Sequence, residues 1–348
     1  MGGLTQSVSA PVLASTRRVR LLRALAVVLF APLAAWCLAA ILLTGAHTAA
    51  IHWLRWLGGA CFVALLIGCG WKLPLRGAAA AVVVASLLVV AGWSRVRPSN
   101  EREWAPEQSR LAWAEIDGSR VTLHGIRNFR YRSASDWDAG WYDAVFDTDE
   151  LEGADYLVVQ FSERRGPAHT IVSFRFAGER FVTFSVEVRK EQGESYGLLR
   201  GLFRQFELVY LVADERDAVQ LRTNHLRDEV FLYPATGSKQ KMAMVFMALA
   251  RRLNDLREEA EFYNTLTNNC TTNLVLHWER INDLELPRDH RILLPGYSDD
   301  LAYEYGIIER HGSFEETRAR ARIGELALAA ADEEDFSLRI RARPEDRE

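Results

Sequence analysis

One residue of this sequence has a type and a setting that suit covalent chemistry, the cysteine of Thr267-Asn-Asn-Cys-Thr-Thr-Asn273. Thr267, Asn268 and Asn269 are residue types that cap helix N-termini, and apolar residues follow them at helical spacing. Cys270 therefore falls in the first turn of a predicted helix, where unpaired N–H groups and the helix dipole favour a thiolate. Such a thiolate is a nucleophile near neutral pH; the alternative is an inert, packed cysteine.

A predicted β-hairpin from Ala168 to Arg189 carries a matching base. Its even-numbered positions are almost all apolar, whereas the odd-numbered ones include His169, Ser185 and Glu187. Like faces must pair across the strands, and a three-residue Ala-Gly-Glu loop gives a register in which His169 faces Glu187. A carboxylate opposed in this way can orient the imidazole and leave its other nitrogen as a base. The alternative is a surface His–Glu pair without a function.

Both helices and strands are predicted to position these residues. Helical spacing predicts helices over Lys239 to Ala260 and Thr271 to Ile281. Short runs rich in Val, Phe, Tyr and Ile, bounded by Gly, Asp or Ser, predict strands over Arg120 to Arg132, Ala154 to Phe161, Thr170 to Phe176, Arg180 to Arg189 and Glu207 to Ala213. We therefore expect an α+β domain with an antiparallel sheet packed on helices.

Three apolar runs precede this domain, Leu21 to Leu43, Trp53 to Trp71 and Gly77 to Trp93. Each is about long enough to cross a hydrocarbon core of roughly 30 Å as a helix. A cleavable signal peptide is the alternative for the first run, but that run is longer than the usual ~7–15 apolar residues and two more follow. Basic residues before the first run and between the second and third place both segments in the cytoplasm.

The sequence thus predicts four parts: a cytoplasmic segment over 1–20, a three-span anchor over 21–97, a catalytic domain outside the inner membrane over 98–312, and a charged tail over 313–348. Within this tail, Ala329 to Glu348 is poor in large apolar residues and is expected to be a frayed helix or disordered. Residues 1–100 hold nine of the 42 Lys/Arg and none of the 46 Asp/Glu side chains. The outer part is therefore acidic, which argues against nucleic-acid binding. Neither a glycine-rich phosphate loop nor a metal-ligand spacing occurs, so no metal and no cofactor are expected.

The order of a histidine strand before an Asn-Cys helix start resembles the circularly permuted, papain-like NlpC-type superfamily. From about Leu123 to Tyr305 the chain is similar, more specifically, to the bacterial Lnb N-terminal periplasmic domain family. The matching segments are Arg127-Asn-Phe-Arg-Tyr-Arg132, Trp141-Tyr142, Ala168-His-Thr170, Glu187-Val-Arg-Lys-Glu191 and the run around Cys270. The anchor here precedes the domain, whereas the family name describes proteins whose membrane part follows it.

This resemblance implies an acyltransferase associated with N-acylation of lipoproteins, with Cys270 as nucleophile and His169 as base. Membrane phospholipid would be the acyl donor and a lipoprotein amine the acceptor. The register adds Glu187 as the orienting acid, and Asn268 or Asn269 could assist backbone N–H groups as oxyanion donors.

The candidate substrate-binding residues are Arg127, Arg130, Arg132, Trp141 and Tyr142. Arg130 and Arg132 share one face of a strand and could meet a phosphate head group, or they could be ordinary solvated arginines.

Two other functional classes stay open. A cysteine peptidase or amidase acting on cell wall or lipopeptides would use the same residues with water as acceptor. A non-enzymatic envelope sensor or assembly protein would require His169 and Cys270 to lie apart.

Overall fold

The computed structural model describes residues 10–45, 49–162 and 164–342. Parts of three predicted segments lie outside these residues: 1–9 of the cytoplasmic segment, 46–48 between the first two apolar runs, and 343–348 of the tail. The chain divides into two compact units, Met1–Arg97 with Phe203–Gln205, and Pro98–Leu202 with Phe206–Glu348.

The first unit contains three long apolar helices, α1 (Ala10–Leu43), α2 (Ala49–Lys72) and α3 (Leu75–Ser94). Leu21–Leu43, His52–Lys72 and Leu75–Ser94 are each long and apolar enough to cross a membrane. Buried Cys37, Phe62 and Ala85 pack together between the helices. The prediction of three long apolar helices is confirmed.

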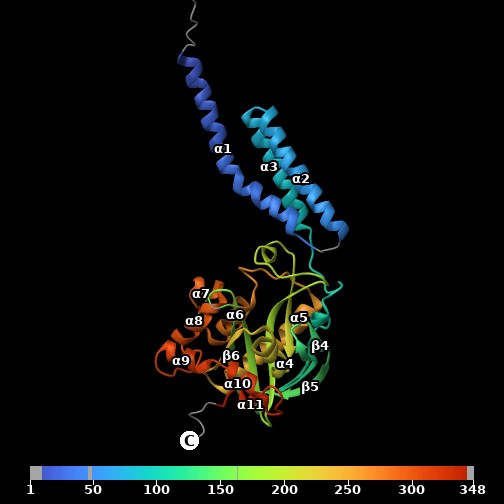
Figure 1. The fold of residues 1–348 in the computed structure, drawn as a ribbon, viewed down its shortest axis with the longest axis vertical. Helices are drawn as coiled ribbons and strands as arrows, with labels where there is room; N and C mark the ends of the chain where they lie inside the picture. Colours follow the sequence, from blue (N-terminus) through green and yellow to red (C-terminus); the bar gives the residue numbers. More distant parts are fainter. Residues whose placement is uncertain (1–9, 46–48, 163, 343–348) are drawn as a thin grey trace, which may run out of the picture. The chain divides into compact units, whose positions relative to one another are not determined.

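The second unit is built on a mixed, mainly antiparallel sheet (Figure 1). Its strands are β1 (Trp113–Asp117), β2 (Arg120–Arg127), β5 (Trp141–Asp147), β6 (Leu151–Gln160), β7 (Ala168–Phe176), β8 (Arg180–Arg189), β9 (Glu207–Ala213) and β10 (Glu229–Pro234). They follow the order β1-β2-β9-β8-β7-β6-β10, with β5 paired to β2 and a single parallel contact between β2 and β9. A separate two-stranded sheet joins β3 (Arg130–Ser133) to β4 (Asp136–Asp138).

Two helices cover the apolar face of the hairpin β7–β8. Phe174, Val182 and Phe184 are buried there against Phe246 and Leu249 of α5 (Lys239–Glu258). The side chain of Phe246 meets Phe174 and Phe184 edge to face, with ring centroids 5.1 and 5.7 Å apart. Helix α6 (Cys270–Asn282) lies in the same layer, with Cys270 at the border of this core. The predicted α+β fold with helices on a sheet is confirmed.

The opposite face is covered by α4 (Glu215–Gln220), the π-helical turn Leu221–Leu226 and the end of the chain. Short helices α7 (His290–Leu293) and α8 (Ser298–Glu304) precede α9 (Phe314–Ala321), α10 (Gly324–Ala329) and α11 (Phe336–Arg339). Ile323, Phe336 and Ile340 are fully or almost fully buried among the residues of the sheet.

The expectation of a frayed helix or disordered chain from Ala329 onward is therefore wrong for residues 329–342. The segment has few large apolar side chains, but Phe336 and Ile340 reach the sheet core. The half-buried Arg341 adds ion pairs to Asp155 and Glu215 that composition does not reveal.

The hairpin has the predicted register. Ile171 pairs with Ser185 and Phe176 with Arg180, which is the pairing that a three-residue loop imposes. The predicted strand over Arg120 to Arg132 is instead two strands, β2 and β3. It breaks because the N–H of Phe129 donates to the Asp217 carboxylate, 2.6 Å away, and not to a neighbouring strand.

Candidate active site

Cys270 begins helix α6, as the capping pattern predicts. The N-cap is Asn269, whose side chain accepts from the N–H of Thr272, while the N–H of Asn269 donates back to the Thr272 hydroxyl. This capping box fixes the first turn and with it the direction of the Cys270 side chain. The thiol is only 5% exposed.

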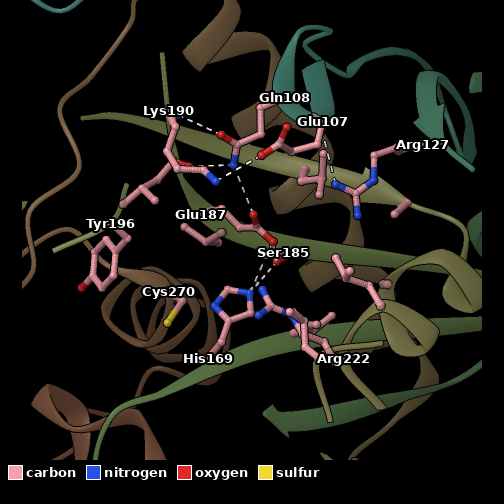
Figure 2. A pocket seen from close by; sticks show the side chains of 18 of the residues that line it. Glu107, Gln108, Arg127, His169, Ser185, Glu187, Lys190, Tyr196, Arg222 and Cys270 are labelled. Atoms are coloured by element: carbon pink, nitrogen blue, oxygen red, sulfur yellow. Dashed lines mark hydrogen bonds and ion pairs between the residues drawn. The ribbon is translucent and has the colours of Figure 1, made fainter. Parts of the chain in front are cut away.

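His169 lies beside this thiol, at the start of strand β7 (Figure 2). Burial raises the pKa of the Cys270 thiol, but hydrogen bonding and charge from His169 lower it more, so that the pKa falls to about 7. His169 and Cys270, 101 positions apart in the sequence, are thus brought together as a base and a thiol. At neutral pH a substantial fraction of the sulfur is thiolate.

The other side of the imidazole faces a serine that sequence reasoning did not single out. Nε2 of His169 lies 2.6 Å from Oγ of Ser185, and this hydroxyl donates to Oε1 of Glu187 over 2.8 Å. Because the single hydroxyl proton points to Glu187, Ser185 must accept from Nε2–H. Nδ1 then carries the free lone pair on the side of Cys270 (Figure 2).

Glu187 therefore contacts the imidazole through the Ser185 hydroxyl and not by a direct hydrogen bond. Its Oε1 lies 3.7 Å from His169 Nε2, and Ser185 bridges the two groups. Burial raises the pKa of Glu187, but the positive charges of His169, Arg222 and Arg127 lower it to about 2. The predicted direct contact of Glu187 with the imidazole is thus corrected to a His169–Ser185–Glu187 chain. Ser185 is the diagonal neighbour of His169 in the predicted register, which is the signal that could have found it.

These groups open into a cavity of about 450 Å³, referred to below as the Cys270 pocket. Its polar residues gather beside His169: Gln108 donates to Glu187 over 3.3 Å, and Lys190 pairs with Glu107 over 3.1 Å (Figure 2). Most of the remaining wall is apolar and includes Phe161, Ile171, Val188, Leu211, Leu221 and Leu226. The pocket can therefore hold a long apolar group next to a charged one.

Asn268 and Asn269 hold the loop before α6 and do not line this pocket. The Asn268 amide donates to Phe262 O, and its oxygen accepts from Asn273. The Asn269 amide donates to Thr265 O over 2.7 Å. Because both amides are used inside the loop, the candidate oxyanion donors are the backbone N–H groups of the first turn of α6.

Arg127 lines the pocket, but its guanidinium is engaged by a buried carboxylate. Its Nη2 lies 2.6 Å from Oδ1 of Asp217, and the Arg127 residue is only 4% exposed. The same carboxylate accepts from the Phe129 N–H and, over 3.1 Å, from the Tyr131 hydroxyl. Arg127 therefore fixes the wall of the pocket, and its role as a substrate ligand stays a prediction.

The other four predicted substrate ligands lie outside the Cys270 pocket. On strand β3, Arg132 is neutralised by Asp136 and Asp138, each 2.6 Å from it. The preceding arginine of that strand, Arg130, is exposed.

The two aromatic candidates, Trp141 and Tyr142, contact other side chains of the domain. Trp141 packs edge to face on Phe129, with ring centroids 5.0 Å apart. Tyr142 donates to Asp214 over 3.2 Å. For all four residues, a role in substrate binding stays a prediction.

Within residues 10–45, 49–162 and 164–342, no group of three or more His, Cys, Asp or Glu side chains could hold a metal ion.

The fold and the site define an α+β domain with a buried Cys–His pair at a helix start. Residues 137–296 match the family model described as the Lnb N-terminal periplasmic domain, and this stretch includes His169, Ser185, Glu187 and Cys270. The predicted resemblance is confirmed over these residues, and with the three apolar helices it indicates a membrane protein with a periplasmic domain. The papain-like relationship stays a prediction. The chain matches no curated protein and no solved structure.

Proposed function

We propose that this protein is a membrane-anchored thiol acyltransferase that moves an acyl chain from a membrane lipid, through a Cys270 thioester, to an amine. The observation that carries the proposal is the Cys270–His169 pair: a buried thiol with a pKa of about 7 at a helix start, beside an imidazole held by Ser185. The mainly apolar wall of the Cys270 pocket supports an acyl substrate.

The chemistry consists of two acyl transfers. In the first, the Cys270 thiolate attacks the ester carbonyl, the carbon–oxygen bond breaks, and imidazolium at His169 gives its proton to the departing alcohol. In the second, a neutral amine attacks the thioester, its proton passes to His169, and the carbon–sulfur bond breaks to regenerate the thiolate. The N–H groups of Cys270 and Thr271 stabilise the oxyanion of each tetrahedral intermediate, because the first turn of a helix leaves its N–H groups without helical partners.

The proposal extends to the cell envelope of a bacterium. The three apolar helices cross the inner membrane, the basic segments stay in the cytoplasm, and the second unit lies in the periplasm. Phospholipid is the proposed donor, and the N-terminal amine of a lipoprotein is the proposed acceptor. Both proposed substrates are held in the membrane, so the anchor would keep the catalytic domain close to them.

Intact-mass measurement tests the first half-reaction directly. The full chain, purified and incubated with phospholipid vesicles, should gain the mass of one acyl group, and the adduct should map to Cys270 and disappear on treatment with neutral hydroxylamine. The Cys69→Ser variant controls for the other thiols and should acylate normally. Absence of the adduct, with release of free fatty acid, would favour a thiol hydrolase that uses the same residues.

A further inference from the structure

Four exposed apolar side chains surround the start of α6. Leu198 and Leu199 are 55% and 66% exposed, Leu266 is 49% exposed, and Tyr196 is 44% exposed. We call these four residues the apolar rim. They come from two loops, one between β8 and β9 and the other directly before Cys270.

The two loops are joined so that the rim is one surface. The Thr265 hydroxyl donates to Leu198 O over 2.9 Å, and the Thr265 N–H donates to Gly201 O over 3.3 Å. A Cβ at Gly201 would collide with the Thr265 hydroxyl, so the loops pack as closely as a glycine permits. The leucines are therefore held outward and cannot fold into the core.

The rim borders the Cys270 pocket. Tyr196 and Tyr263 both line that pocket, and their rings meet edge to face with centroids 6.3 Å apart. An apolar surface at the mouth of a pocket with an apolar wall offers a continuous path for an acyl chain.

The chain itself indicates which occupant covers the rim. Helix α3 ends at Ser94 and the second unit begins at Pro98, so only three residues connect them. An extended chain of that length spans about 11 Å. The Ser99 N–H donates to Oε1 of Glu207 over 3.2 Å, at the end of the β8–β9 loop that carries Leu198 and Leu199. The short connection from α3 therefore keeps this loop within reach of a bilayer that the apolar helices would cross.

We propose that the apolar rim inserts into the surface of the phospholipid bilayer and seats the mouth of the Cys270 pocket on the lipid. Exposed leucines beside a tyrosine are the residue types that lie in the interfacial region of membranes. The inference concerns binding to the membrane surface, and it holds whether or not Cys270 forms a thioester.

Photocrosslinking from the rim tests this proposal. The full chain carrying Cys270→Ser, which removes any lipid bound as a thioester, receives p-benzoylphenylalanine in place of Leu199 and, in separate samples, of Leu198 or Leu328. Leu328 is a 44% exposed leucine of α10, which packs on the sheet face opposite to α5 and α6, and it serves as the matched control. Each protein is reconstituted in vesicles of phosphatidylethanolamine and phosphatidylglycerol and illuminated, and its intact mass is measured.

Lipid adducts should form severalfold more at positions 198 and 199 than at 328. Circular dichroism of each variant shows that the fold is retained, and the two rim positions guard against a local defect at one of them. Equal labelling at all three positions would overturn the proposal. So would crosslinks from the rim to the protein chain alone, because these would show that protein and not lipid covers it.

Discussion

Two buried polar clusters lie on strand β7, four residues apart, and they have different fates. At His169 the cluster ends in a pocket and contains a thiol with a pKa of about 7. At Ser173 the hydroxyl donates to Glu215, and Arg341 from the C-terminal end pairs with both Glu215 and Asp155, at 2.5 and 2.7 Å.

The two clusters differ in their basic group and in whether they line a cavity. Arginine stays charged at any physiological pH, so the Arg341 cluster holds fixed charges and no mobile proton. Burial raises the pKa of Glu215, but Arg341 lowers it more, and the carboxylate remains ionised. The His169 cluster contains an imidazole and a thiol in place of a guanidinium, and it faces a cavity. The same sheet therefore uses one buried cluster for structure and another for a candidate reaction.

The largest expected effect is the loss of acyl transfer when the His169 cluster is altered. Cys270→Ser raises the pKa of the nucleophile far above neutral, so acyl transfer should fall by roughly 10³-fold or more while unfolding is unaffected. His169→Ala should be nearly as damaging, and the double variant little worse than either, because the two groups act as a unit. The measurement is transfer from labelled phospholipid to a lipopeptide amine. Wild-type transfer by Cys270→Ser would leave the thiol a structural role only.

Altering the Arg341 cluster should instead lower the stability of the second unit. Arg341→Ala leaves the carboxylates of Asp155 and Glu215 buried without their cation, so the free energy of unfolding of the second unit should fall by about 3–5 kcal/mol. Arg339→Ala is the matched control, since Arg339 forms an exposed pair with Asp335 on the same helix and should cost at most about 1 kcal/mol. Denaturant unfolding in detergent measures both variants. Equal losses would mean that the Arg341 cluster contributes no more than a surface ion pair.

The elements that hold the His169 cluster could be predicted from the sequence. The hairpin register follows from alternation and loop length, and the position of Cys270 follows from residue types that cap helices. Both are short-range patterns, in which neighbouring residues largely determine the geometry.

The rest depends on contacts that join distant segments. Arg341 reaches Asp155 across 186 positions and Arg127 reaches Asp217 across 90, and no periodicity marks either pair. Charged residues near the chain end therefore suggested a disordered tail, and arginines in family-like segments suggested substrate ligands. In the structure Arg341 and Arg127 are cations that neutralise buried carboxylates.

The third effect is the pH dependence of the thiol. The pKa of Cys270 is lowered from 9.0 to about 7, so thiolate should be present above that pH and lost as the pH falls through it. Alkylation of Cys270 by iodoacetamide, followed by peptide mass spectrometry, should therefore rise with a midpoint near 7. In His169→Ala the midpoint should move to 9 or above, because burial then acts without the opposing imidazole. An unchanged midpoint would show that His169 does not activate the sulfur.

The smallest effect concerns the bridge between the imidazole and Glu187. Ser185→Ala removes the acceptor of Nε2–H, but Glu187, now 3.7 Å away, can approach and replace it. The loss of one such hydrogen bond costs about 1 kcal/mol, so transfer should fall about fivefold and the alkylation midpoint should rise by less than one unit. Glu187→Gln in the Ser185→Ala background should remove this compensation and lower transfer further. A loss in Ser185→Ala alone as large as that of His169→Ala would mean that Ser185 fixes the imidazole by itself, and that Glu187 contributes only charge.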